Sequence, residues 1–209
     1  MRGDARRARI EALRATMPTG VLDVTGEAGW DPQVDWNVAA VLDGFDPGYF
    51  APGWDGDVNG RLSSTGQLRA DGGIDADVAI DDLGGRLRER PLDGDGQLRL
   101  RGSEGSGKLA LVLGSSRVQA EGTVDATRMD VRAALQPLDL ADLLPTAGGH
   151  LQGTVRLHGA RATPDLAAEL DGNGLQWDGY TIGRLGIHGA LPWRGSGGEL
   201  RVEGDTLQA

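Results

Sequence analysis

Hydrophobic and polar residues alternate along most of the chain beyond Gly20. Residues 117–126 (RVQAEGTVDA) show the pattern most clearly, because the even positions are Val, Ala or Gly and the odd positions are polar or charged. Successive side chains of a β-strand point to opposite faces, so this alternation predicts a strand with one apolar and one polar face.

The same alternation recurs in segments spread over the sequence, and glycine-rich segments separate them. About a dozen short strands at intervals of about 8–12 residues predict an all-β fold, and short turns predict that neighbouring strands are antiparallel. The alternating segments include 34–40, 74–80, 97–101, 108–113, 129–135 and 151–158, and the predicted turns are DGG (71–73), DGDG (93–96), GSEGSG (102–107), DGNG (171–174) and GSGG (195–198).

Two segments depart from this pattern. Residues 4–16 are rich in Ala and Arg, which favour a helix, and Pro18 would end that helix. The expected organisation is therefore a short helical lead-in (1–19) followed by a single continuous β segment (20–209). Residues 138–145 (LDLADLLP) predict one further helical turn that ends at its proline.

Composition narrows the choice among β architectures. Glycine accounts for 35 of the 209 residues, and aromatic residues make up only 4%. A closed sandwich core usually relies on Phe, Tyr and Trp for bulk, whereas a sheet curved around an open groove needs no closed core. Composition therefore favours an all-β, elongated, curved, mostly antiparallel sheet that forms an open apolar groove, without excluding a sandwich, a barrel or a solenoid.

Charge and residue usage exclude several classes of function. The net charge of −10 makes nucleic acid an unfavourable partner, because an acidic surface repels phosphate groups. The chain contains no cysteine, which excludes disulfides and thiolate metal sites. No apolar run reaches the roughly 20 residues of a membrane span, and residues 1–18 do not form a signal peptide. An anchor or export signal would have to lie outside this chain.

Two segments resemble ligand-binding loops but lack essential residues. Residues 102–108 (GSEGSGK) match G-x-x-x-x-G-K, yet Leu109 replaces the Ser or Thr that holds magnesium, and the next residues predict a strand. Residues 55–60 (DGDVNG) match the opening of a calcium loop, but its twelfth position is Gly66 instead of a bidentate Glu. Both segments are therefore interpreted as turns, and no metal or other cofactor is expected.

The sequence carries no recognisable catalytic constellation. A thiol nucleophile is impossible without cysteine, and the motif G-x-S-x-G does not occur. His150, His158 and His188 are interpreted as strand-surface residues. Asp81 and Asp82 are adjacent on a predicted strand and point to opposite faces, which makes them poor acid and base partners. We therefore expect a protein that is not an enzyme.

The apolar stripes are the most organised feature of the sequence. They fit two interpretations, the interior of an ordinary core or the lining of a groove for an apolar ligand. The candidate lining residues are Leu98, Leu100, Leu109, Leu111, Leu113, Val118, Ala120, Val124, Met129, Val131, Leu135, Leu151, Val155, Leu157, Leu166 and Leu170.

An ordered series of short phrases resembles the TamB family of periplasmic translocation and assembly module proteins, which are related to AsmA-like lipid transfer proteins. The resemblance begins at 30–68, where a Trp-containing strand leads into FDP and PGW turns, and continues at 83–100 (LGGRLRERPLDGDGQLRL). It is closest at 131–177, where Leu-Leu-Pro precedes Gly-Gly-x-Leu-x-Gly, a strand, Pro-Asp-Leu and Gly-Leu-x-Trp. The order of the phrases carries the resemblance.

The resemblance implies a long, open-sided β-groove that is apolar inside and polar outside. Proteins of this family are anchored in the inner membrane by an N-terminal helix, extend across the periplasm and contact the outer-membrane barrel protein TamA. The implied function is non-enzymatic: the groove conducts phospholipid acyl chains between the two membranes, and the protein supports outer-membrane protein assembly and secretion. This chain is then expected to be an internal fragment of a longer protein.

A secreted β-solenoid or sandwich, acting as an adhesin or a carbohydrate-binding module, is the alternative. Such a module would bind through exposed aromatic residues on a flat polar face. Trp36 falls in the apolar register, whereas Trp30, Trp54, Trp177 and Trp193 lie near predicted turns and form no evident stripe.

Overall fold

The computed structural model describes residues 2–3, 6–144, 146–192 and 198–208, and most of these lie in β-strands. The chain divides into two compact units, an N-terminal unit (Met1–Leu111) and a C-terminal unit (Val112–Ala209). Each unit is an antiparallel sheet in which every strand pairs with its neighbours in the sequence. The all-β prediction is therefore confirmed.

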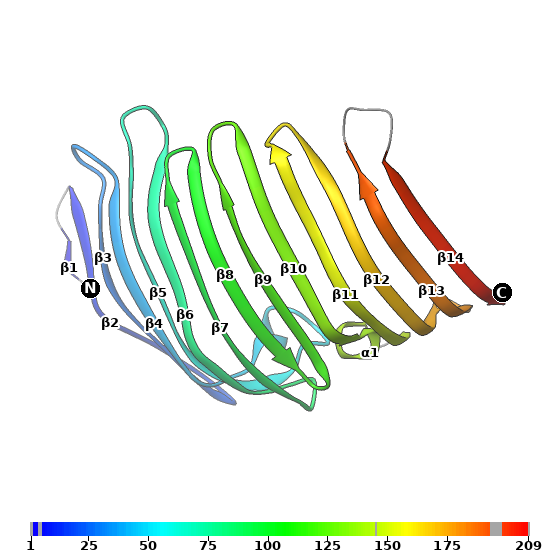
Figure 1. Cartoon of the computed structure of the whole chain (residues 1–209). Helices are drawn as coiled ribbons and strands as arrows, with labels where there is room; N and C mark the ends of the chain where they lie inside the picture. Colours follow the sequence, from blue (N-terminus) through cyan, green and yellow to red (C-terminus); the bar gives the residue numbers. More distant parts are fainter. Residues whose placement is uncertain (1, 4–5, 145, 193–197, 209) are drawn as a thin grey trace. The chain divides into compact units, whose positions relative to one another are not determined.

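The sheet of the N-terminal unit has the strand order β1 to β8 and is not closed, because β1 and β8 are not neighbours in that order. Its strands are long and curved (Figure 1). A single turn of 3-10 helix, η1 (Pro47–Tyr49), lies in the connection between β4 and β5. The strands are β1 (Arg2–Gly3), β2 (Arg7–Met17), β3 (Gly20–Gly29), β4 (Asp35–Phe45), β5 (Gly56–Leu68), β6 (Ile74–Leu87), β7 (Arg90–Arg101) and β8 (Glu104–Leu113), of which β8 ends in the next unit.

The sheet of the C-terminal unit has the strand order β9 to β14. It is also curved and open (Figure 1). The helical turn α1 (Leu140–Leu143) joins β10 to β11, which confirms the helical turn predicted at 138–145. Pro145 itself lies outside the described residues. The strands are β9 (Ser116–Val124), β10 (Arg128–Asp139), β11 (Ala147–Ala160), β12 (Thr163–Trp177), β13 (Tyr180–Leu191) and β14 (Glu199–Gln208).

The helix predicted at residues 4–16 is wrong. Residues 7–17 form β2, which pairs with β3 so that Ile10 lies opposite Gly26 and Arg9 opposite Glu27. The intrinsic helix preference of Ala and Arg amounts to a fraction of a kcal/mol per residue. Pairing with β3 along most of its length gives β2 hydrogen bonds between strands, which outweigh that preference. The prediction of a single continuous groove over 20–209 stays a prediction.

Glycine-rich segments are not all turns. Residues 70–71 and 102–103 are turns, so the hairpin predicted at GSEGSG is confirmed, with β8 beginning at Glu104. In contrast, DGDG lies inside β7 and DGNG inside β12, so both turn predictions are wrong. A Cβ atom on Gly94 would lie 2.9 Å from the carbonyl oxygen of Ala110. Glycine in β7 therefore permits the close approach of β8, and the GSGG segment lies largely outside the described residues.

β-Bulges interrupt the alternation in several strands and keep the apolar side chains on one face. In β6, Ile80 lies opposite Gly96 and Leu83 opposite Gly94, so three residues of β6 span two residues of β7. The extra residue of a bulge shifts the side-chain phase by one position. Because of this shift, two hydrophobic residues three positions apart point to the same face. Bulges of the same kind lie between Ile10 and Leu13, between Leu42 and Phe45, and between Leu135 and Leu138.

Candidate functional site

The C-terminal unit has a face made of apolar side chains and glycine. Residues directly opposite each other in an antiparallel pair lie on the same face, so the strand register defines this surface. At its centre, Val155 of β11 lies between Ala133 of β10 and Ala168 of β12. The three best-defined rows are Gly122–Val131–Leu157–Leu166–Leu191, Ala120–Ala133–Val155–Ala168–Gly189 and Val118–Leu135–Gly153–Leu170–Ile187–Val202.

The opposite face of the C-terminal unit is polar. Arg132 lies between Glu121 and Arg156, and Arg156 forms an ion pair with Asp130. The hydrogen bonds from Arg156 to this carboxylate hold the pKa of Asp130 below its usual value. The two faces therefore differ sharply in chemistry, as the alternation predicted.

The N-terminal unit has a corresponding apolar face. Val78 lies between Ser64 and Leu98, and Ala76 lies between Gly66 and Leu100. The face extends onto β8, since a Cβ atom on Gly96 would lie 3.2 Å from the side chain of Leu109 and one on Gly94 3.1 Å from that of Leu111. Further rows are Val24–Ala40–Leu62–Ile80–Gly96 and Leu22–Leu42–Gly60.

Trp36 lies on this apolar face, as predicted. Its ring covers Gly66, where a Cβ atom would approach the ring to 2.4 Å. Its indole Nε1 donates a hydrogen bond of 2.9 Å to the Oγ atom of Ser64. That bond satisfies the indole N–H, and the surrounding face remains apolar.

The structure brings the predicted lining residues together on the two apolar faces, with Leu98, Leu100, Leu109 and Leu111 in the N-terminal unit and the others in the C-terminal unit. Most of them are only partly buried, and 43% of Leu98 is exposed. These faces are therefore not the interior of a closed core. Among the described residues, the buried hydrophobic side chains are only Val58, Ala76, Leu92, Leu113, Ala147 and Ala168.

Comparison with known proteins places this arrangement in a family. The family model described as "TamB, N-terminal domain" matches residues 1–209. The chain belongs to the TamB family. It is 24% identical over 191 residues to the translocation and assembly module subunit TamB of Haemophilus influenzae. That match covers 90% of this chain and 15% of the relative, so the chain spans about one seventh of the relative's length. No solved structure matches the chain.

This TamB-family chain has two features that bear on membranes and metals. In the described part of the chain, no helix has the length and apolar character needed to span a bilayer. Within the same residues, no group of three or more His, Asp or Glu side chains is placed to hold a metal ion. The interpretation of residues 55–60 as a turn is wrong, because β5 already begins at Gly56. Asn59 Oδ1 in this strand accepts a hydrogen bond of 2.9 Å from the backbone N–H of Gly44.

The histidines of this TamB-family chain lie on strands, as expected. His188 of β13 lies on the polar face, with Nδ1 2.9 Å from Glu169 Oε2 and Nε2 3.4 Å from Asp171 Oδ1. The hydrogen bond to Glu169 raises the pKa of His188, and the charges of Asp171 and Glu203 add to the effect. His188 is therefore held by carboxylates on both sides and is part of a surface ion-pair cluster.

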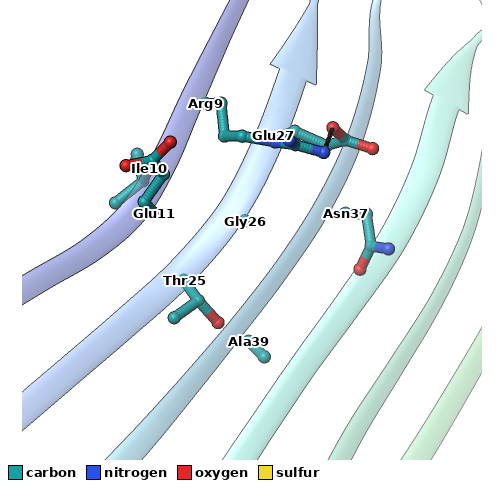
Figure 2. Close-up of a pocket in the computed structure, with 8 residues that line it drawn as sticks. All are labelled: Arg9, Ile10, Glu11, Thr25, Gly26, Glu27, Asn37 and Ala39. Atoms are coloured by element: carbon teal, nitrogen blue, oxygen red, sulfur yellow. Dashed lines mark hydrogen bonds and ion pairs between the residues drawn. The ribbon is translucent and has the colours of Figure 1, made fainter. Parts of the chain in front are cut away.

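An open hollow of about 410 Å³ lies beside the bulge of β2. Figure 2 shows Arg9 and Glu27 reaching across neighbouring strands, with an ion pair of 3.3 Å between them, and Asn37 on the next strand. These three side chains share the polar register of their strands. The hollow therefore belongs to the polar side, and Arg9 and Glu27 pair with each other across it. Its lining residues are Arg9, Ile10, Glu11, Thr25, Gly26, Glu27, Asn37 and Ala39.

Sequence reasoning missed one buried group, the carboxylate of Asp142 in α1, which has 0% exposure. It accepts hydrogen bonds from Ser116 Oγ (2.6 Å), from the backbone N–H of Ser116 (3.0 Å) and from that of Ser115 (3.1 Å). These bonds fix α1 to the hairpin between β8 and β9. The only sequence signal was an aspartate inside an otherwise apolar helical turn.

Proposed function

We propose that this TamB-family chain forms part of a lipid-conducting groove in a protein of the translocation and assembly module. The observation that carries the proposal is the set of apolar rows that cross each unit strand by strand without a charged side chain. In the proposed setting the protein lies in the periplasm, is anchored to the inner membrane and works with an outer-membrane barrel protein of the TamA type. It supports outer-membrane protein assembly and secretion without being an enzyme.

Acyl chains are the ligand that suits such a surface. Strands lie about 4.8 Å apart, so a chain lying across them meets an apolar row position at each strand. Each CH₂ group removed from water contributes about 0.8 kcal/mol, and five such groups about 4 kcal/mol. The transfer of an acyl chain from water to this face is therefore favourable without a tight binding site. The chain can also move along the face, because its binding free energy is similar at each successive strand.

The polar face supports a non-enzymatic role. Several of its charged side chains form ion pairs with one another, as in Arg9–Glu27, Arg156–Asp130 and His188–Glu169. An acid or base has to be positioned toward a substrate with a pKa suited to proton transfer. Carboxylates held in ion pairs on an open sheet face lack that arrangement.

The carbohydrate-binding alternative receives less support. It requires several aromatic side chains on the polar face, whereas Trp36 lies on the apolar face and Trp54 is covered by the guanidinium of Arg88, 5.3 Å from the ring centroid. Trp177, which is 65% exposed, stands at the end of β12. Trp193 lies outside the described residues. No aromatic stripe is present on the polar face of the described chain.

The proposal is tested by site-specific photo-crosslinking in the full-length protein in cells. A crosslinker at Val155 reports on the apolar face, and one at Gln152 on the same strand reports on the polar face. Mass spectrometry of the purified adducts then identifies what each position captures. We expect phospholipid at Val155 and none at Gln152. Equal capture at both positions, or no lipid at Val155, would refute the proposal.

A pair of neighbouring alanines provides a second test. Ala168 is buried on the apolar face between Val155 and Gly189, whereas Ala167 lies on the polar face between Arg156 and Ala190. Ala168→Glu places a charge among apolar rows and should strongly reduce the phospholipid that co-purifies with the protein. Ala167→Glu adds the same charge on the other side and should leave the lipid content unchanged.

A further inference from the structure

The loop that connects β4 to β5 has a conformation defined by hydrogen bonds. The Oδ1 atom of Asp46 accepts hydrogen bonds of 2.9 Å from the backbone N–H groups of Gly48 and Gly56. The carbonyl of Pro47 accepts two more, each of 2.9 Å, from the N–H groups of the two residues that follow η1. Backbone contacts and one carboxylate therefore determine the shape of this loop, and its aromatic side chains are not needed for it.

Two aromatic side chains of this loop face solvent. Phe50 is 76% exposed and Tyr49 is 53% exposed. The ring of Phe50 stacks on that of Phe45, with 6.0 Å between centroids and 8° between ring planes. Burial of an aromatic ring is what makes it stabilising, so a ring as exposed as Phe50 contributes little to the fold.

Phe45 connects the loop to the apolar face of the N-terminal unit. It follows Leu42 across the bulge of β4 and lies opposite Val58, which is buried on the apolar side of β5. Ala40, Leu42 and Phe45 follow one another along the apolar side of β4, and the ring of Phe50 stacks on the last of them. The apolar surface continues from the sheet onto the loop.

We propose that Phe45, Tyr49 and Phe50, here named the aromatic rim, receive the acyl chain of a phospholipid where it enters or leaves the apolar face. This inference rests on the proposed function. The occupant is inferred from continuity, because a ligand that moves along the apolar rows reaches the rim without crossing a charged position. Aromatic rings with one polar tip, such as Tyr49, suit a boundary between an apolar phase and water.

The test compares three crosslinker positions in the purified full-length protein mixed with vesicles of phosphatidylethanolamine and phosphatidylglycerol. Phe50 reports on the rim, Val38 on the apolar face between Gly26 and Ser64, and Gln97 on the polar face. Phospholipid capture at Phe50 and Val38, but not at Gln97, supports the rim. Phospholipid capture at Val38 alone, or a protein adduct at Phe50, overturns the inference about the aromatic rim and leaves the proposed function standing. No capture at either position overturns both.

A kinetic comparison adds a functional readout. Phe50→Ser should slow phospholipid capture at Val38 by about fivefold, which corresponds to about 1 kcal/mol in the barrier. The matched control is Val41→Ser, because Val41 is 46% exposed on the polar register of β4. The melting temperature should stay unchanged in both variants, and Tyr49→Ser should act in the same direction as Phe50→Ser. Equal capture rates for Phe50→Ser and Val41→Ser would overturn the inference.

Discussion

The carboxylate of Asp142 offers the sharpest test of how α1 is held, through the substitution Asp142→Ala. The side chain is fully buried and accepts hydrogen bonds from the backbone N–H groups and the hydroxyls of Ser115 and Ser116. Alanine removes the acceptor without filling its space. The N–H groups of Ser115 and Ser116 then lose the partner that holds α1 against the hairpin.

The magnitude follows from the groups left without partners. Ser116 Oγ retains an alternative acceptor, the carbonyl oxygen of Asp139 at 3.3 Å, so the hydroxyl contributes little to the loss. The N–H groups of Ser115 and Ser116 lose the acceptor that Asp142 provides, and an unsatisfied donor at a buried position such as Ser116 costs about 1–3 kcal/mol. Removing a buried carboxylate also relieves its desolvation penalty. We therefore expect a loss of about 3 kcal/mol in the free energy of unfolding.

Two measurements check this expectation. Urea denaturation of the whole chain gives the change in the free energy of unfolding. Amide hydrogen exchange of Ser115 and Ser116 reports local release of α1, since a four-residue helix is not stable alone. Glu121→Ala is the matched control, because it removes an exposed carboxylate from β9 and should change stability by less than about 0.5 kcal/mol. An equally small change in Asp142→Ala, with Ser115 and Ser116 still protected, would refute the reasoning.

Two further predictions concern the C-terminal unit. Gly153→Ala should destabilise the fold by about 1–3 kcal/mol in thermal or urea unfolding, because Gly153 has φ +131° and a Cβ atom would lie 1.9 Å from the carbonyl oxygen of Glu169. Gly148→Ala on the same strand should be nearly neutral, since its nearest neighbour would be 3.6 Å away. Glu169→Gln should lower the pKa of His188 in an NMR titration, because Glu169 is the main cause that raises it. In the wild type, stability from protonated His188 is fully present below the unfolded pKa of about 6.5 and is lost as pH rises through the higher folded pKa. An unchanged pKa in Glu169→Gln would contradict this assignment.

The sequence by itself determined the class of fold and the composition of its two faces. The strict alternation at 117–126 places Val118 and Gln119 on opposite faces of a strand. Short connections between consecutive strands make neighbouring strands antiparallel. The same local rule placed the predicted lining residues on apolar faces. Family membership followed from the order of short phrases and agrees with the match over residues 1–209.

Only the tertiary structure decided where the alternation changes phase. Ile80 and Leu83 are three residues apart, which the period of two assigns to opposite faces. The bulge in β6 returns them to one face, and its position depends on the pairing with Gly96 and Gly94 of β7. Such a pairing joins residues distant in the sequence, and a local pattern carries no information about it.

The strand at residues 7–17 and the aromatic rim both depend on tertiary contacts that local sequence preference does not predict. β2 forms because β3 provides its hydrogen-bond partners, although its residues prefer a helix in isolation. Phe45 and Phe50 stack because the bulge of β4 and the bonds of Asp46 bring their rings together. Local preferences therefore set the alternation of each strand, and contacts between strands determined its phase, its pairing and the surfaces available for binding.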